Sequence, residues 1–290
     1  MSRHLIVTHH APDLDACGAV WLLKRFVGQH FADAKIVFVN PGETISLEAA
    51  EEMGCQLHEV THVDTGLGEF DHHQPDRGLL PISASSLVYD HVVKIHPDQA
   101  DNHALTTLVK LISHIDHFGE ASWPEAEHER YCLMIHDLIR GAEFVDPHND
   151  DSQLHFGLQC LDHAYAVLVQ FLKARELIES DGIIFSTRFG ECLAIETKND
   201  DTIKVAQKKG YQLVIKKDPE QGNARIKARP DAPFDLRPIA DAITKVDTKG
   251  TWYYHPSGKM LLNGSQKHRN QTATPLSLSE LIELVKTAYA

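Results

Sequence analysis

The sequence has few cysteines, and no two of them stand in a C-x-x-C spacing. Cys17, Cys55, Cys132, Cys160 and Cys192 are scattered along the 290 residues, a pattern that indicates reduced thiols in a cytosol. No apolar run is long enough to cross a bilayer, and no signal peptide is recognisable at the amino terminus. We therefore expect a cytoplasmic protein that makes no membrane contact.

An overall excess of positive charge is also lacking. The formal net charge is −13, although residues 176–290 carry 17 Lys and Arg against 15 Asp and Glu. The acidic excess therefore lies in the first 175 residues. An acidic protein lacks the basic surface that binds duplex DNA tightly, so we expect no duplex DNA partner. The carboxyl-terminal part could still guide a short anionic substrate.

Periodic segments predict a two-part organisation. The first part alternates expected strands with expected helices, which is typical of an α/β fold with a parallel sheet. The expected strands are 4–8, 35–40 and 58–64, and the expected helices lie near 16–29, 46–53, 84–96, 104–116, 128–140 and 152–179. We place the first domain at residues 1–175.

The pattern changes after Ser180-Asp-Gly182, where short strands dominate. The expected elements are a hairpin of 183–186 with 192–197, a helix at 202–208, strands at 211–217 and 224–229, a helix at 236–246, and a last helix from Ser277. Ser277 and Glu280 form a capping-box pattern at the start of that helix. These elements predict a smaller α+β domain over residues 181–290.

Histidines and aspartates gather where the first part's strands end. His9, Asp13 and Asp15 follow the first expected strand, and Asp64 ends the strand at 58–64. Asp71-His72-His73 stands on an expected returning strand after Phe70, and Asp116 ends a helix. Loops at the carboxyl ends of strands form the ligand crevice of open α/β sheets. Carboxylates and imidazoles at these spacings suit a pair of divalent ions that hydrolyse a phosphate ester or anhydride.

The H-x-x-x-D-x-D loop, the isolated Asp64, the Asp-His-His triplet and the later Asp116 resemble the four motifs of the DHH phosphoesterase superfamily. Its members include single-strand exonucleases, oligoribonuclease-like phosphatases, cyclic-dinucleotide phosphodiesterases, polyphosphatases and manganese-dependent pyrophosphatases. Asp64 and Asp71 stand only seven residues apart, a spacing that is similar to the Myg-type branch, whose members are linked to 3′→5′ RNA exonuclease activity. The fourth motif lacks the frequent Asp-Thr-Gly ending, which weakens the assignment of Asp116.

The resemblance implies a role for each motif residue. His9 and Asp13 would hold one ion, Asp64 would bridge both ions, and the second ion would be held by Asp15, His72 and Asp116. With no thiolate among these ligands, Mn²⁺ is favoured, with Mg²⁺ as the alternative.

The resemblance also implies the catalytic residues. His73 would bind the phosphate or protonate the leaving oxygen, and Asp71 would orient a histidine from outside the ligand set. The nucleophile would be a water activated by the two ions. His114 and His117 flank Asp116 and are secondary candidates, whereas the other histidines of this chain, which has 20, are expected mostly on its surface.

Many DHH enzymes carry a small carboxyl-terminal domain in which an Arg and a Gly-rich loop grip the substrate. Arg229 is similarly placed here, but the Gly-Gly-Gly-His loop is missing. The candidates for substrate binding are Arg229, His255, Ser257, Gly258, Ser265 and Lys267. The alternative is that these residues form ordinary turns and a solvated basic edge.

These features predict a metal-dependent phosphohydrolase, first of all a phosphodiesterase or exonuclease acting on short single-stranded RNA or small nucleotides. A manganese-dependent pyrophosphatase or polyphosphatase is the alternative enzyme, although the short spacing from Asp64 to Asp71 counts against it. A nucleotide-sensing protein that binds without turnover is the non-enzymatic alternative. The sequence is compatible with a homo-oligomer.

Overall fold

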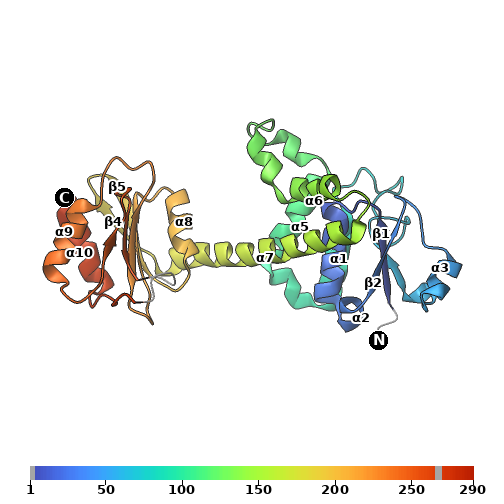
Figure 1. Ribbon diagram of the computed structural model, residues 1–290, viewed down its shortest axis with the longest axis horizontal. Coiled ribbons are helices and arrows are strands. Elements are labelled where there is room, and N and C mark those ends of the chain that lie inside the picture. The colour runs from blue at the N-terminus through green and yellow to red at the C-terminus, as the bar shows by residue number, and fades with distance from the viewer. Residues whose placement is uncertain (1–3, 265–269) are drawn as a thin grey trace. The chain divides into compact units, whose positions relative to one another are not determined.

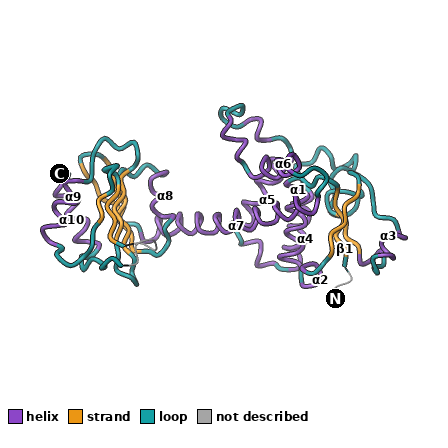
Figure 2. Tube along the Cα trace, viewed as in Figure 1, coloured by secondary structure: helices purple, strands orange, loops and turns teal. Residues whose placement is uncertain are grey.

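The computed structural model, drawn in Figures 1 and 2, describes residues 4–264 and 270–290. The chain divides into two compact units, Met1–Leu168 and Val169–Ala290. Helix α7 (Asp150–Asp181) spans the division, so the expected boundary at residue 175 falls inside a continuous helix. Among the described residues, no helix is both long and apolar enough to cross a membrane.

The first unit is built on a parallel sheet, which confirms the predicted α/β class. Its strands β1 (Leu5–His9), β2 (Lys35–Val39) and β3 (Val60–His62) lie in the order β2-β1-β3. Ile6 belongs to the main core, whereas Leu5 and Val7 pack into a smaller core with residues of and beside helix α3 (Leu47–Glu52). Both faces are thus covered, as parallel sheets require.

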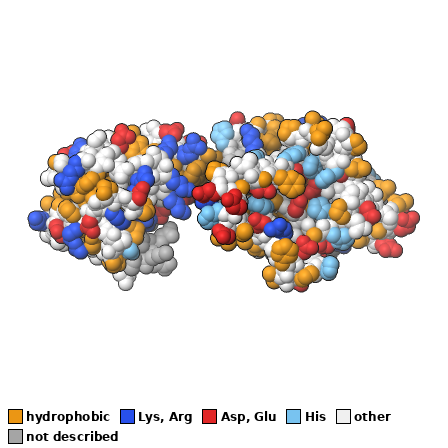
Figure 3. Space-filling model, turned by 90° about the horizontal axis from the view of Figure 1, so that it is seen from above, with side chains coloured by type: hydrophobic (Ala, Val, Ile, Leu, Met, Phe, Trp, Pro, Cys, Tyr) orange, Lys and Arg blue, Asp and Glu red, His pale blue; other side chains and the backbone are white. Residues whose placement is uncertain are grey.

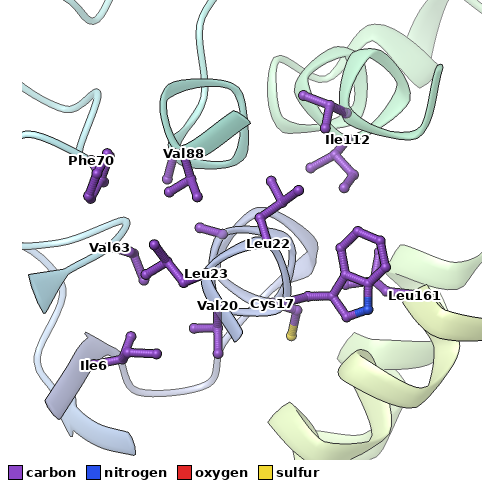
Figure 4. Packing of buried hydrophobic residues seen from close by; sticks show 14 of the residues in the cluster. Ile6, Cys17, Val20, Leu22, Leu23, Val63, Phe70, Val88, Ile112 and Leu161 are labelled. Carbon is purple, nitrogen blue, oxygen red and sulfur yellow. The ribbon is translucent and has the colours of Figure 1, made fainter. Parts of the chain in front are cut away.

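Helix α1 (Leu14–Leu22) is the centre of this unit, and all of its residues are buried. In Figure 4 its side chains spread outward, with Leu22 toward the neighbouring helices, while Leu23, the first residue of the following π-helical segment, points toward the strands. It packs against α4 (Ala84–Ile95) and α5 (His103–Asp116). A Cβ at Gly18 would lie 2.3 Å from Ser85 Oγ, so only glycine permits this approach of α1 to α4.

Three local predictions differ from the structure in their bounds or in the type of element. The helix expected at 16–29 starts earlier, at Leu14, and becomes a π-helical segment over Leu23–Val27 followed by the short α2 (Gln29–Ala32). The helix expected at 128–140 is a 3₁₀ segment, Glu129–Leu133, followed by α6 (Ile135–Val145), because Met134 between them has an extended backbone. The returning strand after Phe70 reduces to one bridge between Val63 and Phe70, since the chain reverses through left-handed residues, including Asp64 and Leu67.

The second unit is a six-stranded mixed sheet in the order β4-β5-β6-β7-β9-β8. The strands are β4 (Ile183–Thr187), β5 (Gly190–Glu196), β6 (Leu213–Lys217), β7 (Ala224–Ala228), β8 (Tyr253–Tyr254) and β9 (Met260–Asn263). Helices α9 (Arg237–Val246) and α10 (Leu278–Ala288) cover one face, and α8 (Asp201–Lys208) covers the other, as Figure 1 shows. The predicted hairpin and the capping box of Ser277 and Glu280 are confirmed.

Candidate metal centre

Four segments bring histidine and carboxylate side chains together at the carboxyl end of the parallel sheet. His9 is the last residue of β1, Asp64 follows β3, His72 follows the bridge at Phe70, and Asp116 is the last residue of α5. Asp13 is the N-cap of α1, and its Oδ1 accepts bonds from the Asp15 and Ala16 amides. This is the edge at which open α/β sheets bind their ligands.

Asp64 presents its two carboxylate oxygens to different histidines. Oδ2 lies 3.3 Å from His9 Nε2, and Oδ1 lies 3.4 Å from His72 Nε2. The side chain is buried, and its backbone has a left-handed φ of 55°, a conformation that aspartate tolerates better than most residues. One carboxylate therefore joins two groups of candidate ligands, which is the arrangement expected of a bridging residue.

The first group consists of His9, Asp13 and Asp64, whose ligand atoms all lie within 4.8 Å of one another. His9 Nδ1 lies 2.8 Å from the His10 carbonyl oxygen, which can only accept, so Nδ1 carries the proton. In the neutral imidazole, Nε2, which lies 3.3 Å from Asp64 Oδ2, then keeps the lone pair that a cation would take. A backbone carbonyl that fixes the tautomer in this way is typical of metal-binding histidines.

The second group centres on His72. Its Nε2 lies 3.4 Å from Asp64 Oδ1 and 3.6 Å from Asp116 Oδ2. All three atoms are buried, yet none makes an aligned hydrogen bond to any described residue. Buried polar atoms without partners are uncommon and costly. Their convergence on one point, with a donor set of imidazole and carboxylates, fits a divalent cation.

Asp15 is also close to this group, but its oxygens have other partners. Its Oδ2 lies 3.8 Å from His72 Nε2. The same carboxylate accepts hydrogen bonds from the Ala84 and Ser85 amides at 2.6 and 2.9 Å. These N–H groups at the start of α4 have no partner within the helix. Asp15 thus ties α1 to α4, and each of its oxygens retains a lone pair for a cation.

Asp71 and His73 form a pair beside the ligands. Asp71 is fully buried and accepts hydrogen bonds from the Leu67 amide at 2.7 Å and from His73 Nδ1 at 2.8 Å. The His73 side chain is 58% exposed. Because Nδ1 is engaged by Asp71, His73 Nε2 is the ring nitrogen left for a substrate.

The histidines that flank Asp116 are placed differently from each other. His117 Nε2 donates a hydrogen bond to the Ile82 carbonyl oxygen at 2.9 Å, which occupies that nitrogen. His114 stacks on Trp123 and accepts a hydrogen bond from its indole N–H. His72, Asp116 and His117 nevertheless lie close enough to form a candidate ligand group, as do Asp64, His72 and His73.

Burial and neighbouring charges both shift the pKa values of the centre. Burial lowers the pKa of His9, but the hydrogen bond and charge of Asp64 outweigh this effect and raise the pKa to about 9. The proximity of Asp64 likewise raises the pKa of His72 to about 9. Burial raises the pKa of Asp116 to about 6 and that of Asp13 and Asp15 in the same direction, with further contributions from neighbouring carboxylates. A cluster of buried carboxylates of this kind is relieved by cations.

A cleft of about 680 Å³ opens over these side chains. Its lining also includes four residues that the sequence analysis did not single out: Phe118, Glu120, His136 and Arg140. His136 and Arg140 are four residues apart on α6, a spacing that places them on one helix face. The helix expected at 128–140 already contained both residues, but no sequence motif linked that helix to the metal centre.

The loop that carries Asp13 is held by the first turns of α7. Asp150 accepts hydrogen bonds from His10 Nδ1 at 2.6 Å and from the Ala11 amide at 2.7 Å. Gln153 donates to the Pro12 carbonyl oxygen at 3.1 Å. Asp150 and Gln153 are therefore positioning residues that the motif spacing did not reveal.

The candidates for substrate binding in the second unit have partners of their own. Arg229 forms a two-pronged pair with Asp231 at 2.8 and 2.6 Å. His255 Nδ1 lies 2.8 Å from Ser257 Oγ, and Gly258 adopts a left-handed turn beside Asp235. Ser265 and Lys267 lie outside the described residues. The role of all six candidates in substrate binding stays a prediction.

No family profile and no curated protein matches the sequence. Among solved structures, one match is a DHH-domain member of the s1p family of ribosomal proteins, at 15% identity and a TM-score of 0.34, covering 98% of this chain and 85% of that chain. Two others are RecJ of Thermus thermophilus in complex with Mn²⁺ and with Mg²⁺, each at 11% identity and a TM-score of 0.32. The two RecJ matches span 98% of this chain but only 51% and 49% of the RecJ chains.

Proposed function

We propose that the protein is a phosphohydrolase that uses two divalent cations, Mn²⁺ or Mg²⁺. The observation that carries the proposal is the convergence of Asp64 Oδ1, His72 Nε2 and Asp116 Oδ2, which are buried, adjacent and without hydrogen bonds among the described residues. His9 and Asp13 form the neighbouring group through Asp64. A hydrophobic or purely structural role would leave these three atoms with an uncompensated desolvation cost.

Each residue of the centre has a defined task in this proposal. His9, Asp13 and Asp64 hold one ion, whereas Asp15, Asp64, His72 and Asp116 hold the other. Bound divalent ions supply Lewis acidity and a nucleophile at neutral pH. Asp71 fixes the ring of His73, so that Nε2 can contact a phosphoryl oxygen or hand a proton to the leaving oxygen.

The substrate that we propose is a phosphodiester of short single-stranded RNA or another small nucleotide. The motif spacing similar to the Myg-type branch supports this choice. Arg229 and His255 are proposed to contribute to binding, so Arg229→Ala and His255→Ala should mainly raise KM, because each removes binding shared by the ground state and the transition state.

The test is a substrate screen with the full chain, stripped of metal and reloaded with Mn²⁺. The panel contains bis(p-nitrophenyl) phosphate, dinucleotides, RNA oligomers, cyclic dinucleotides, pyrophosphate and polyphosphate. We expect hydrolysis of dinucleotides and short RNA, abolished by EDTA and restored by Mn²⁺. Preferential hydrolysis of pyrophosphate or polyphosphate would instead identify the alternative enzyme, and metal binding without any turnover would identify a nucleotide sensor.

Asp64→Asn is the variant that tests the bridging carboxylate. Loss of its charge raises the repulsion between the two cations, so we expect metal content and activity to fall together, with less than about 1% of the rate remaining. Asp33→Asn makes the same change at a residue outside the centre and should leave both quantities unchanged. Near-normal turnover in Asp64→Asn would contradict the two-metal proposal.

A further inference from the structure

One face of helix α6 forms a wall of the metal cleft. His136, Arg140 and Glu143 all line the cleft and stand at positions i, i+4 and i+7, which share one helix face. The same cleft is lined by Asp13, His72, His73 and Asp116. A substrate that reaches the metal residues therefore also meets α6.

Arg140 is the only lysine or arginine among the described residues that line this cleft. Its Nη2 donates to Asp137 Oδ1 at 2.8 Å, and its guanidinium carbon lies 5.7 Å from the centre of the Phe144 ring. The guanidinium group has five N–H donors, and the contact with Asp137 leaves several of them free. The Arg140 side chain is 66% exposed, and an accessible guanidinium with free donors suits the recognition of phosphate.

Asp137 contacts two of the three wall residues, Arg140 and His136. Besides accepting from Arg140, it places Oδ2 3.7 Å from His136 Nε2. His136 Nδ1 and Glu120 Oε2, both on cleft-lining residues, are buried and have no hydrogen-bond partner among the described residues. A polar molecule bound in the cleft would supply hydrogen-bond partners for these two atoms.

Phe118 adds an aromatic surface at the same cleft. Its side chain lies among the cleft-lining residues, and the residue is 78% exposed. Its φ is 54°, a left-handed conformation that an aromatic residue rarely adopts. Strained backbone of this kind tends to occur at functional sites. An exposed ring close to metal ligands is suited to stacking on a nucleobase.

We propose that this cleft binds a nucleoside phosphate, with Arg140 holding a phosphate group and Phe118 packing against the base. His136 contributes a hydrogen bond to the same phosphate, and Asp137 orients both side chains. The inference rests on the proposed function and adds to it the residues that bind the phosphate and the base of the substrate. The aromatic surface of Phe118 favours a base-bearing substrate over pyrophosphate or polyphosphate.

The test measures binding to the full chain in the presence of Mn²⁺, using calorimetric titration with 5′-AMP and, separately, with inorganic phosphate. Arg140→Gln should weaken the binding of both by about 10-fold or more, since it removes a charge-assisted hydrogen bond. The matched control is Arg130→Gln, because Arg130 also pairs with a carboxylate, that of Glu125, and lies over an aromatic ring, that of Tyr131, but is not among the cleft-lining residues.

Phe118→Leu should weaken the binding of 5′-AMP by about 10-fold and leave the binding of phosphate unchanged, whereas Phe118→Tyr, which keeps the ring, should bind like the wild type. Thermal melts of each variant establish that it is folded. Wild-type protein that binds 5′-AMP no more tightly than phosphate, or Arg140→Gln and Phe118→Leu variants with wild-type affinities, would overturn the inference.

Hydrolysis of bis(p-nitrophenyl) phosphate separates this outcome from a failure of the proposed function. Mn²⁺-dependent hydrolysis together with unaltered nucleotide binding in the variants would refute only the nucleotide cleft. Binding of 5′-AMP that depends on Arg140 and Phe118, without hydrolysis of any phosphate ester, would refute the phosphohydrolase and keep the cleft.

Discussion

The two histidines of the Asp-His-His triplet have opposite environments at the residue scale. His72 is buried among three carboxylates, and its Nε2 lies within 3.8 Å of Asp15, Asp64 and Asp116. His73 is largely exposed and engages Asp71 through Nδ1. Neighbouring positions in the sequence thus serve different tasks, because the side chains of these two successive residues leave the backbone in different directions.

His72→Ala should lose metal, whereas His73→Ala should keep metal and lose rate. General acid or phosphate contact accounts for on the order of 10²–10⁴-fold in rate, and that is the loss we expect for His73→Ala. Elemental analysis together with kcat on the best substrate checks both statements. Equal metal loss in the two variants would show that both histidines are ligands.

Metal binding should release protons at pH 7.5. In the metal-free protein the pKa of both His9 and His72 is raised to about 9, whereas a bound cation requires neutral imidazole. The ion pairs of these histidines with Asp64 stabilise the metal-free fold below about pH 6.5, and that contribution is lost as the pH rises through about 9. Metal affinity should therefore increase with pH up to about 9.

Calorimetric titration of Mn²⁺ in buffers of different ionisation enthalpy measures this release. We expect at least one proton per protein molecule at pH 7.5 and a smaller number at pH 9.5. An apparent enthalpy that is independent of the buffer would mean that His9 and His72 are already neutral in the metal-free protein.

The close approach of α1 to α4 is the critical feature at the scale of elements. Gly18 faces Ser85 on α4 and Ile112 on α5, and a Cβ at this position would lie 2.3 Å from Ser85 Oγ and 2.9 Å from Ile112 Cδ1. Ser85 in turn binds the backbone and side chain of Asp15. Packing of these helices therefore determines where Asp15 lies.

Gly18→Ala should destabilise the first unit by about 1–3 kcal/mol, because overpacking outweighs the gain in helix propensity. Gly141→Ala is the matched control: Gly141 also lies within a helix, α6, but nothing lies within 4 Å of a Cβ there. That variant should gain about 0.5–1 kcal/mol. Urea unfolding in EDTA measures both changes, and equal effects at the two glycines would contradict the close packing at Gly18.

The two units have separate hydrophobic cores at the scale of the whole molecule. One core surrounds α1 in the first unit, and the others cover the two faces of the six-stranded sheet in the second. The candidate metal ligands all belong to the first unit. The first unit is also the more acidic one, and in Figure 3 red and pale-blue side chains are frequent over it, whereas blue ones are frequent over the second.

Calorimetric unfolding should therefore show two transitions, of which Mn²⁺ raises only one. A cation at about 100 times its Kd stabilises the unit that binds it by about 2.7 kcal/mol, which shifts the Tm of a unit of this size by about 5–11 °C. The scan is compared in EDTA and in Mn²⁺ with the full chain. An equal shift of both transitions would show that the metal also stabilises the second unit.

The sequence alone was sufficient for the elements whose signals are local. The alternation of apolar runs predicted β1, β2 and most helices to within a few residues, and the pattern of Ser277 and Glu280 predicted a capping box. The order of the His, Asp and Asp-His-His motifs after strand and helix ends also predicted that His9, Asp64, His72 and Asp116 would lie close together. These features depend on periodicity, capping and the common edge of parallel strands.

Only the tertiary structure decided features that depend on contacts between distant segments. The two oxygens of Asp64 point to different histidines because its backbone is left-handed, and Asp15 caps α4 because Gly18 lets the two helices approach. Arg140 and His136 belong to the site because α6 borders the metal cleft, although neither residue stands in a recognised motif. A motif specifies which ligand types are available, but the direction of each side chain is set by packing against residues far away in the chain.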